Sequence, residues 1–241
     1  MTTTDEHPPR LSLPVAVLAG GRGTRLGARV DDVPKPLVEV AGEPFLFHSL
    51  RRLAASGVSR VVLCVGYLGE QIEEVVGSRR FGIQVDYSYD GPGLDGTLGA
   101  LRRARHLLGE KFLVLYGDTI LTLDYRELTE SWDRSALPAV MAVLENGGRW
   151  GPSNTQVGDG LVVAHDKVVP TPEMTWIDYG VGGLSVEALE LVAPAESDLS
   201  ALYGALASAG QLGAFVVTRR FYEIGTPSGL AETEAHLTQG I

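Results

Sequence analysis

The chain has 241 residues, of which 44% are apolar and 21% charged, and its formal net charge at pH 7 is −10. This composition is typical of a globular protein with its own core, and the acidic balance argues against extended contact with nucleic acid or an anionic membrane. The longest apolar runs are far shorter than the roughly 20 residues of a membrane-spanning helix, and a single cysteine excludes internal disulfides.

The first ten residues, MTTTDEHPPR, are polar and contain prolines. They lack the basic start and the apolar stretch of a secretory signal, so we predict a cytoplasmic protein. We also predict that residues 1–10 form a flexible tail and that residues 11–241 form one domain.

The chain up to about residue 135 alternates between two patterns. Apolar runs predict strands, and apolar stripes at helical spacing predict helices between them. The expected strands are 13–18, 58–65, 83–89 and 111–116, and the expected helices are 45–55, 69–76 and 97–108. Helices of this length imply crossover connections and an α/β fold with a doubly wound, mostly parallel sheet. Such sheets bind ligands beyond the carboxyl ends of their strands.

The pattern changes at about residue 136. Short apolar pieces divided by Gly, Pro, Asn and Asp indicate a more antiparallel second half. There we expect strands at 136–144, 155–163, 179–184 and 212–218, and helices at 185–191, 200–208 and 228–237. The expected division of the domain is therefore 11–135 and 136–241.

The strongest functional signal follows the first predicted strand. Residues 18–26 read LAGGRGTRL, and Pro34-Lys35-Pro36 comes shortly after. Glycines after a strand let backbone N–H groups approach phosphate oxygens closely. Arg25 can add a bidentate positive charge, and Lys35, held extended by its prolines, can reach the same phosphates. The pattern indicates a loop that binds a polyphosphate.

Two other nucleotide-binding patterns do not fit this loop. A dinucleotide fingerprint needs glycine or alanine where Leu26 stands and an acidic residue at the end of the next strand, which instead ends at Gly66 and Tyr67. The Gly-Lys-Ser or Gly-Lys-Thr of a phosphate-loop NTPase is absent from the sequence. Both a nicotinamide-dependent dehydrogenase and a phosphate-loop enzyme are therefore disfavoured.

LAGGRGTRL with PKPL resembles the signature of the sugar-1-phosphate nucleotidyltransferases, and the similarity extends from about Leu13 to His236. The resemblance implies a Rossmann-like, nucleotide-diphospho-sugar transferase fold. It implies that Arg25 grips the triphosphate and that Lys35 contacts the α-phosphate and the incoming sugar phosphate. The implied nucleotide-binding residues are Leu18, Ala19, Gly20, Gly21, Gly23, Thr24, Arg25, Gly96, Thr97 and Gly117.

Two acidic residues match the metal ligands of that family. Asp118, in Tyr116-Gly117-Asp118, resembles the aspartate at a strand end, and Glu223, before Ile224-Gly225-Thr226-Pro227, stands where an aspartate is commoner. Mg²⁺ favours one or two carboxylates together with substrate phosphate oxygens. The resemblance therefore implies a Mg²⁺ ion held by Asp118 and Glu223, with Arg25, Lys35 and Asp118 as the catalytic residues.

The residues that contact the base and the sugar phosphate of the substrates are assigned by resemblance. Residues 90–100, DGPGLDGTLGA, resemble the family loop that lines the base and ribose, although Asp95 and Leu98 depart from it. The implied sugar-phosphate residues are Asn154, Asp166, Lys167 and Gly180. In this assignment the acid at 166 holds sugar hydroxyls and the lysine at 167 holds the phosphate.

The expected reaction is attack of a sugar 1-phosphate oxygen on the α-phosphorus of an NTP, with release of pyrophosphate. The chain looks closest to the short heptose-phosphate guanylyltransferases, so GTP and a heptose- or mannose-type phosphate are the expected substrates. Uridylyl, thymidylyl or cytidylyl transfer to another sugar phosphate remains an alternative, as does a non-catalytic subunit that senses nucleotide sugars. The expected partners exclude nucleic acid and membranes, and the sequence leaves open whether the chain forms a homo-oligomer.

Overall fold

The computed structural model describes residues 11–24, 26, 32–91, 93 and 95–239. The predicted tail and Arg25 lie outside the described residues. Within the described part, none of the helices combines the length and the apolar character that crossing a membrane requires.

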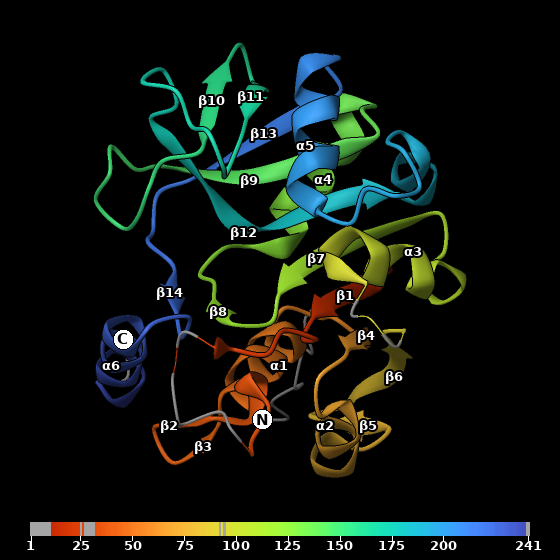
Figure 1. Ribbon diagram of the computed structural model, residues 1–241, viewed down its shortest axis with the longest axis vertical. Helices are drawn as coiled ribbons and strands as arrows, with labels where there is room; N and C mark the ends of the chain where they lie inside the picture. The colour runs from red at the N-terminus through yellow and green to blue at the C-terminus, as the bar shows by residue number, and fades with distance from the viewer. Residues whose placement is uncertain (1–10, 25, 27–31, 92, 94, 240–241) are drawn as a thin grey trace, which may run out of the picture.

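The described residues form a main sheet of ten strands. They are β1 (Val15–Leu18), β4 (Arg60–Val65), β5 (Arg79–Arg80), β6 (Ile83–Tyr89), β7 (Lys111–Tyr116), β9 (Ala139–Glu145), β10 (Thr155–Gly158), β11 (Leu161–His165), β12 (Trp176–Ser185) and β13 (Leu212–Val217). Their order across the sheet is β10-β11-β13-β9-β12-β7-β1-β4-β6-β5 (Figure 1). Two short pairs lie outside it, β2 (Glu39–Val40) with β3 (Glu43–Pro44), and β8 (Thr119–Ile120) with β14 (Tyr222–Glu223).

The strand directions divide the sheet as the sequence predicts. Neighbouring strands from β7 through β1 and β4 to β6 are parallel. In the second half, β12 runs antiparallel to β7 and to β9, and β11 runs antiparallel to β10 and β13, while β9 and β13 are parallel. The predicted α/β fold, with a doubly wound parallel half and a more antiparallel second half, is confirmed.

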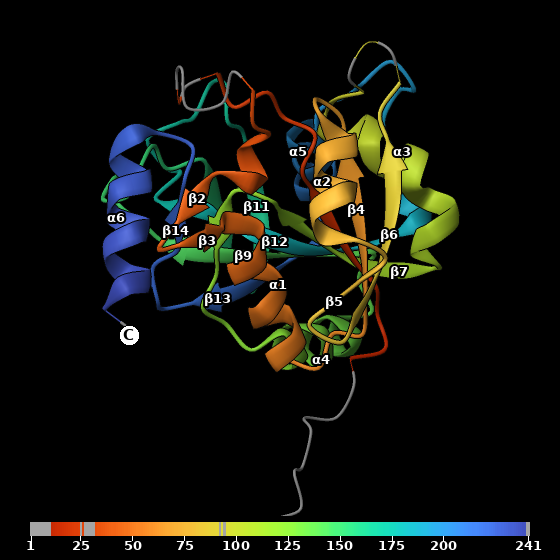
Figure 2. The ribbon, with the colours of Figure 1, turned by 90° about the horizontal axis from the view of Figure 1, so that it is seen from below.

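Helices cover both faces of the sheet. They are α1 (Phe45–Ala55), α2 (Gly69–Val76), α3 (Gly96–Leu108), α4 (Tyr125–Ser135), α5 (Leu199–Ser208) and α6 (Pro227–Thr238), with 3₁₀ turns η2 (Lys35–Leu37) and η3 (Val186–Glu190). The apolar sides of α1, α2 and α4 share one buried cluster, and those of α3 and α5 share the other. Figure 2 shows α2 and α3 on opposite sides of β4 and β6. Helix α6 packs on a third, smaller cluster at the edge of the molecule.

Two predicted elements differ from the observed ones, and one α-helix was not predicted. The strand expected at 155–163 is a hairpin, because Asp159 and Gly160 turn the chain with positive φ angles of 51° and 76° between β10 and β11. The helix expected at 185–191 is the 3₁₀ turn η3. Helix α4 was not predicted, although its signal is local: the Asp124 carboxylate accepts hydrogen bonds from the N–H groups of Arg126 and Glu127 and caps it.

The arrangement of β1 creates the position for a ligand site. Strand β1 lies between β4 and β7, and the chain passes from β4 to β6 on one side before it returns to β7 on the other. In register, Leu18 at the end of β1 lies between Cys64 of β4 and Tyr116 of β7. The connections that leave these carboxyl ends diverge, which opens the crevice where ligands of such sheets bind.

Candidate active site

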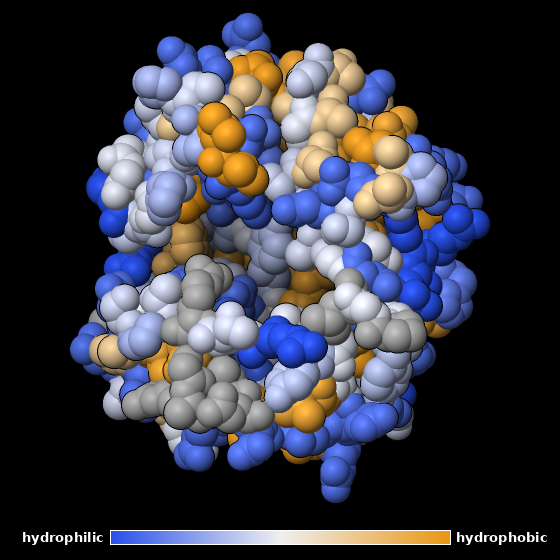
Figure 3. All heavy atoms as spheres, viewed as in Figure 1, coloured by the Kyte–Doolittle hydropathy of each residue, from blue (hydrophilic) through white to orange (hydrophobic). Residues whose placement is uncertain are grey.

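A cavity of about 400 Å³ lies beyond the carboxyl ends of β1, β4 and β7. It is lined by Leu18, Ala19, Gly20, Gly21, Gly23, Thr24, Lys35, Pro36, Cys64, Asp90, Gly96, Thr97, Ala100, Tyr116, Gly117, Asp118 and Gly225. Figure 3 shows the molecule hollowed on this face. Of the residues that the resemblance implied for nucleotide binding, every one but Arg25 lines this cavity, and Arg25 lies outside the described residues.

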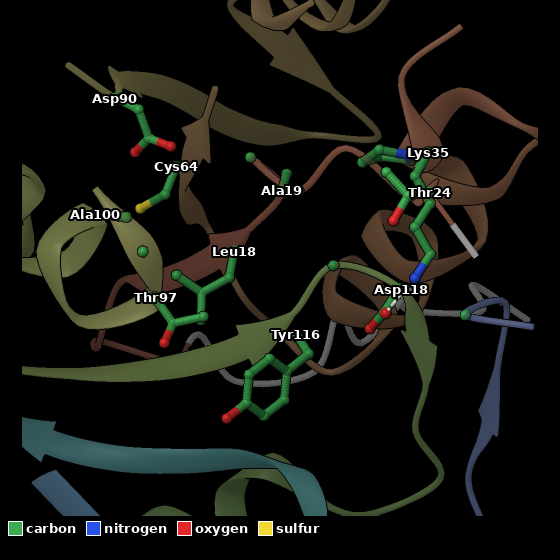
Figure 4. A pocket seen from close by; sticks show the side chains of 17 residues that line it. Leu18, Ala19, Thr24, Lys35, Cys64, Asp90, Thr97, Ala100, Tyr116 and Asp118 are labelled. Carbon is green, nitrogen blue, oxygen red and sulfur yellow. Dashed lines mark hydrogen bonds and ion pairs between the residues drawn. The ribbon is translucent and has the colours of Figure 1, made fainter. Parts of the chain in front are cut away.

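The cavity has two chemically different ends (Figure 4). Asp90 and Cys64 lie at one end, near Ala100 of α3, and Lys35 and Asp118 lie at the other. Burial raises the pKa of the Cys64 thiol to about 12, so the thiol stays protonated and is an apolar part of the wall. Burial, and then the charge of Asp95, raise the pKa of Asp90 above its usual value.

Lys35 and Asp118 form an ion pair at the second end. The Lys35 Nζ lies 2.5 Å from Oδ2 of Asp118. Lys35 begins η2 directly after Pro34, and it is 8% exposed, so its ammonium is directed inward rather than into solvent. The Asp118 carboxylate, one residue past Gly117, keeps about a third of its surface exposed and also accepts a hydrogen bond from the Thr119 hydroxyl.

Glu223 reaches the same end from the far part of the chain. Strand β14 pairs with β8 so that Glu223 lies opposite Thr119, and the N–H of Ile224 donates to the carbonyl of Asp118 at 3.0 Å. The Glu223 carboxylate accepts hydrogen bonds from the Gly225 N–H and the Thr226 hydroxyl. The three segments that carry Lys35, Asp118 and Glu223 therefore meet.

Gly225 has no room for a side chain at this meeting point. A Cβ atom on Gly225 would collide with the Glu223 carboxylate and would lie 3.4 Å from the Lys35 Nζ. The ammonium of Lys35 thus stands between the Asp118 carboxylate and the loop that holds the Glu223 carboxylate. The described residues contain no cluster of three or more acidic, histidine or cysteine side chains that could hold a metal ion.

Lys167 lies beside the cavity and is bound to residues of two strands. Its ammonium donates to the Tyr116 hydroxyl at 2.9 Å and lies 2.9 Å from Oδ2 of Asp178. Burial opposes both charges of this pair, but their attraction prevails, because the pKa of Asp178 is lowered and the pKa of Lys167 is raised well above its usual value. Tyr116 lines the cavity, so Lys167 is held next to it.

The other residues expected at the sugar end make hydrogen bonds within the protein itself. The Asp166 carboxylate accepts hydrogen bonds from the N–H groups of Val168 and Val169, so it closes its own turn. The Asn154 side-chain oxygen accepts the N–H of Asp178, and the N–H of Gly180 donates to the Asp178 carboxylate. Sequence analysis missed Asp178, whose one signal is an acidic residue inside an otherwise apolar strand.

Comparisons with known proteins agree on the kind of molecule. Residues 15–156 match the family described as the MobA-like NTP transferase domain. A D-glycero-alpha-D-manno-heptose 1-phosphate guanylyltransferase of Aneurinibacillus thermoaerophilus is 36% identical over 115 residues, which cover 47% of this chain and 50% of the relative. An N-acetylmuramate alpha-1-phosphate uridylyltransferase of Neisseria meningitidis is 38% identical over 160 residues, 64% of this chain and 66% of the relative. The chain thus matches about half to two thirds of the length of these relatives.

Solved structures of similar proteins cover almost the whole chain. HddC from Yersinia pseudotuberculosis superposes with a TM-score of 0.78 at 28% identity, over 93% of this chain and 99% of that protein. That protein has also been crystallised in complex with GMP-PN.

Proposed function

We propose that this chain, which belongs to the MobA-like NTP transferase family, transfers a nucleoside monophosphate from an NTP to a sugar 1-phosphate and releases pyrophosphate. The observation that carries the proposal is the meeting of Lys35, Asp118 and Glu223 at one end of a glycine-lined cavity. The names of its relatives support the reaction class, since they are a guanylyltransferase and a uridylyltransferase of sugar 1-phosphates.

In the proposed reaction, an oxygen of the sugar 1-phosphate attacks the α-phosphorus of the NTP. A new P–O bond forms while the bond to the bridging oxygen of the β-phosphate breaks, and pyrophosphate leaves with that electron pair. The attacking oxygen is already an anion, so no general base is required. Lys35 offsets charge on the α-phosphate and Lys167 holds the sugar phosphate, so catalysis consists of alignment and charge neutralisation.

The site fits a divalent cation such as Mg²⁺. Asp118 and Glu223 offer two carboxylates, the number that Mg²⁺ commonly takes from a protein beside phosphate oxygens. The ammonium of Lys35 already stands against Asp118, so the site attracts positive charge. When bound, Mg²⁺ neutralises phosphate charge in the transition state. Asp118 and Glu223 are its proposed ligands.

We propose GTP as the nucleotide, with Asp90 as the residue that recognises the base. Asp90 lies at the end of the cavity away from Lys35 and Asp118, where a nucleotide with its phosphates at those residues would place its base (Figure 4). Guanine presents two neighbouring N–H donors, on N1 and on the exocyclic amine, and a carboxylate has two oxygens to accept them. Uracil and thymine present one such donor and cytosine an amine without an adjacent N–H, so this carboxylate favours guanine.

Release of pyrophosphate tests the reaction. We expect the chain to release it from an NTP only when a sugar 1-phosphate is present, with GTP and a heptose or mannose 1-phosphate as the best pair. Nucleotide binding without release in any combination of the four NTPs and a panel of sugar 1-phosphates would favour the alternative, a sensing subunit. Release that is fastest with UTP would keep the reaction and overturn the choice of base.

Substitution of Asp90 tests the base separately. Asp90→Asn is expected to lower kcat/KM for GTP about 30-fold or more, because a hydrogen bond to a charged group is lost and an amide donor faces guanine donors. ITP, which lacks the exocyclic amine, is expected to lose less than GTP. Asp86→Asn is the matched control, because Asp86 pairs with Arg60 and does not line the cavity. Equal effects of both substitutions on GTP would contradict the role of Asp90.

A further inference from the structure

Arg102 of α3 donates hydrogen bonds to the backbone carbonyls of a segment from the second half of the chain. Its guanidinium donates to five carbonyl oxygens, at N···O distances from 2.7 to 3.3 Å. The acceptors are Leu189, Val192, Ala193, Pro194 and Glu196. A planar group with five N–H donors can hold such a curved backbone in one shape, which no other side chain can do.

The same segment continues onto the first turn of α3. The carbonyl of Ser197 accepts the N–H of Leu98 at 2.8 Å, and the N–H of Leu199 donates to the Thr97 hydroxyl at 2.8 Å. The Glu196 carboxylate accepts the N–H groups of the two residues that follow it. Residues 189–199 therefore form a continuous strap, fixed at one end by Arg102 and at the other by Thr97 and Leu98.

Helix α3 depends on this strap because it lacks a cap of its own. Asp95, the residue before the helix, makes no capping hydrogen bond with its side chain. The first N–H groups of a helix have no partner within it, so the carbonyl of Ser197 takes the place of a cap. The turn that is fixed in this way includes Gly96 and Thr97, both of which line the cavity.

We propose that Arg102 is a positioning residue for nucleotide binding: it holds the strap 189–199, and the strap holds Gly96 and Thr97 against the base and ribose. The proposal rests on the proposed function for the identity of the ligand. Arg102 itself does not line the cavity, so it acts only through the strap. The strap belongs to the second half of the chain and α3 to the first, so nucleotide affinity depends on a contact between the two halves.

The test compares Arg102→Met with Arg105→Met. Arg105 lies nearly one turn further along α3 and meets the same strap through one exposed ion pair with Glu190, at 3.2 Å. We expect Arg102→Met to weaken binding of GMP-PNP about tenfold by calorimetry and to raise KM for GTP equally, with kcat nearly unchanged. Arg105→Met is expected to change neither, because exposed pairs contribute little. KM for the sugar 1-phosphate is expected to stay the same in both.

Two further measurements separate positioning from general loss of structure. Hydrogen exchange is expected to quicken at the amides of Leu98 and Leu199 in Arg102→Met and to remain slow in β4 and β7. If that variant fails to fold, Arg102→Lys, which keeps the charge but offers three donors, is expected to weaken GMP-PNP binding about threefold. Unaltered GMP-PNP affinity in a folded Arg102 variant overturns this inference alone, whereas absence of nucleotide binding by the unsubstituted protein overturns it together with the proposed function.

Discussion

The proposed phosphate end of the candidate site, at Lys35 and Asp118, and the proposed sugar end, at Lys167, are built in different ways. At the phosphate end, Asp118 comes directly after β7, Lys35 begins η2 in the connection that follows β1, and β14 adds Glu223 by pairing beside Asp118. At the sugar end, Lys167 follows a hairpin strand, and its partner Asp178 lies within β12. The first end is set by strand ends and the second by pairing between side chains, so substitutions should affect them differently.

The largest effect is expected at the phosphate end. Asp118 carries the negative charge that faces Lys35, and it is a proposed metal ligand. Asp118→Asn removes that charge, so kcat is expected to fall about a thousandfold or more while the protein stays folded. Turnover measured by pyrophosphate release gives the result. Asp133→Asn, which breaks an exposed pair with Lys111, is the control and should leave turnover unchanged. A fall in kcat of less than about tenfold in Asp118→Asn would mean that substitutions at the two ends differ less in their effects than we propose.

At the sugar end, Lys167→Met is expected to raise KM for the sugar 1-phosphate by about 30-fold, because a charged contact to phosphate is lost. It also leaves the buried Asp178 carboxylate without its cation, at a cost of about 3 kcal/mol in the free energy of unfolding. The double variant Lys167→Met with Asp178→Asn should regain most of that stability and none of the affinity. Recovery of KM in the double variant would show that Lys167 acts through the fold alone.

A smaller contrast separates two neighbouring acids. Asp178→Asn is expected to raise KM for the sugar 1-phosphate by about fivefold, because Lys167 loses the partner that holds it. Asp166→Asn should change KM by less than about twofold, since an amide oxygen can accept the same two N–H groups of its turn. A larger increase in KM for Asp166→Asn would support the direct contact between Asp166 and the sugar hydroxyls that the resemblance implies.

The contrast between these acids also explains how much the sequence could predict. The glycine loop, Lys35 and Asp118 could be located because contiguous motifs follow strands, and the carboxyl ends of parallel strands meet at one edge. Asp178 could not, because its pairing with Lys167 depends on how the second half of the chain folds against β7. Thr97, which the resemblance implied for nucleotide binding, lines the cavity, but nothing local predicts that its hydroxyl accepts the distant Leu199 N–H.

A further effect concerns pH and the stability of the second half of the chain. Burial lowers the pKa of His165 to about 4, and the ring lies between the hydroxyls of Thr155 and Ser200. Below about pH 6.5, His165 binds a proton in the unfolded chain but stays neutral in the folded chain. The free energy of unfolding should therefore fall between pH 6.5 and 4, by on the order of 2 kcal/mol. His165→Gln should remove this part of the pH dependence of thermal unfolding. An unchanged profile in that variant would assign the acid sensitivity elsewhere.

Binding of Mn²⁺ in the presence of GMP-PNP, followed by electron paramagnetic resonance, tests most directly whether Asp118 and Glu223 hold one ion. We predict that Asp118→Asn and Glu223→Gln each weaken Mn²⁺ binding by about tenfold or more. Glu232 lies on α6 and forms an exposed pair with Arg220, so the Glu232→Gln variant should bind Mn²⁺ as the unsubstituted protein does. Wild-type Mn²⁺ affinity in Glu223→Gln would contradict a shared ion and, with it, the central claim.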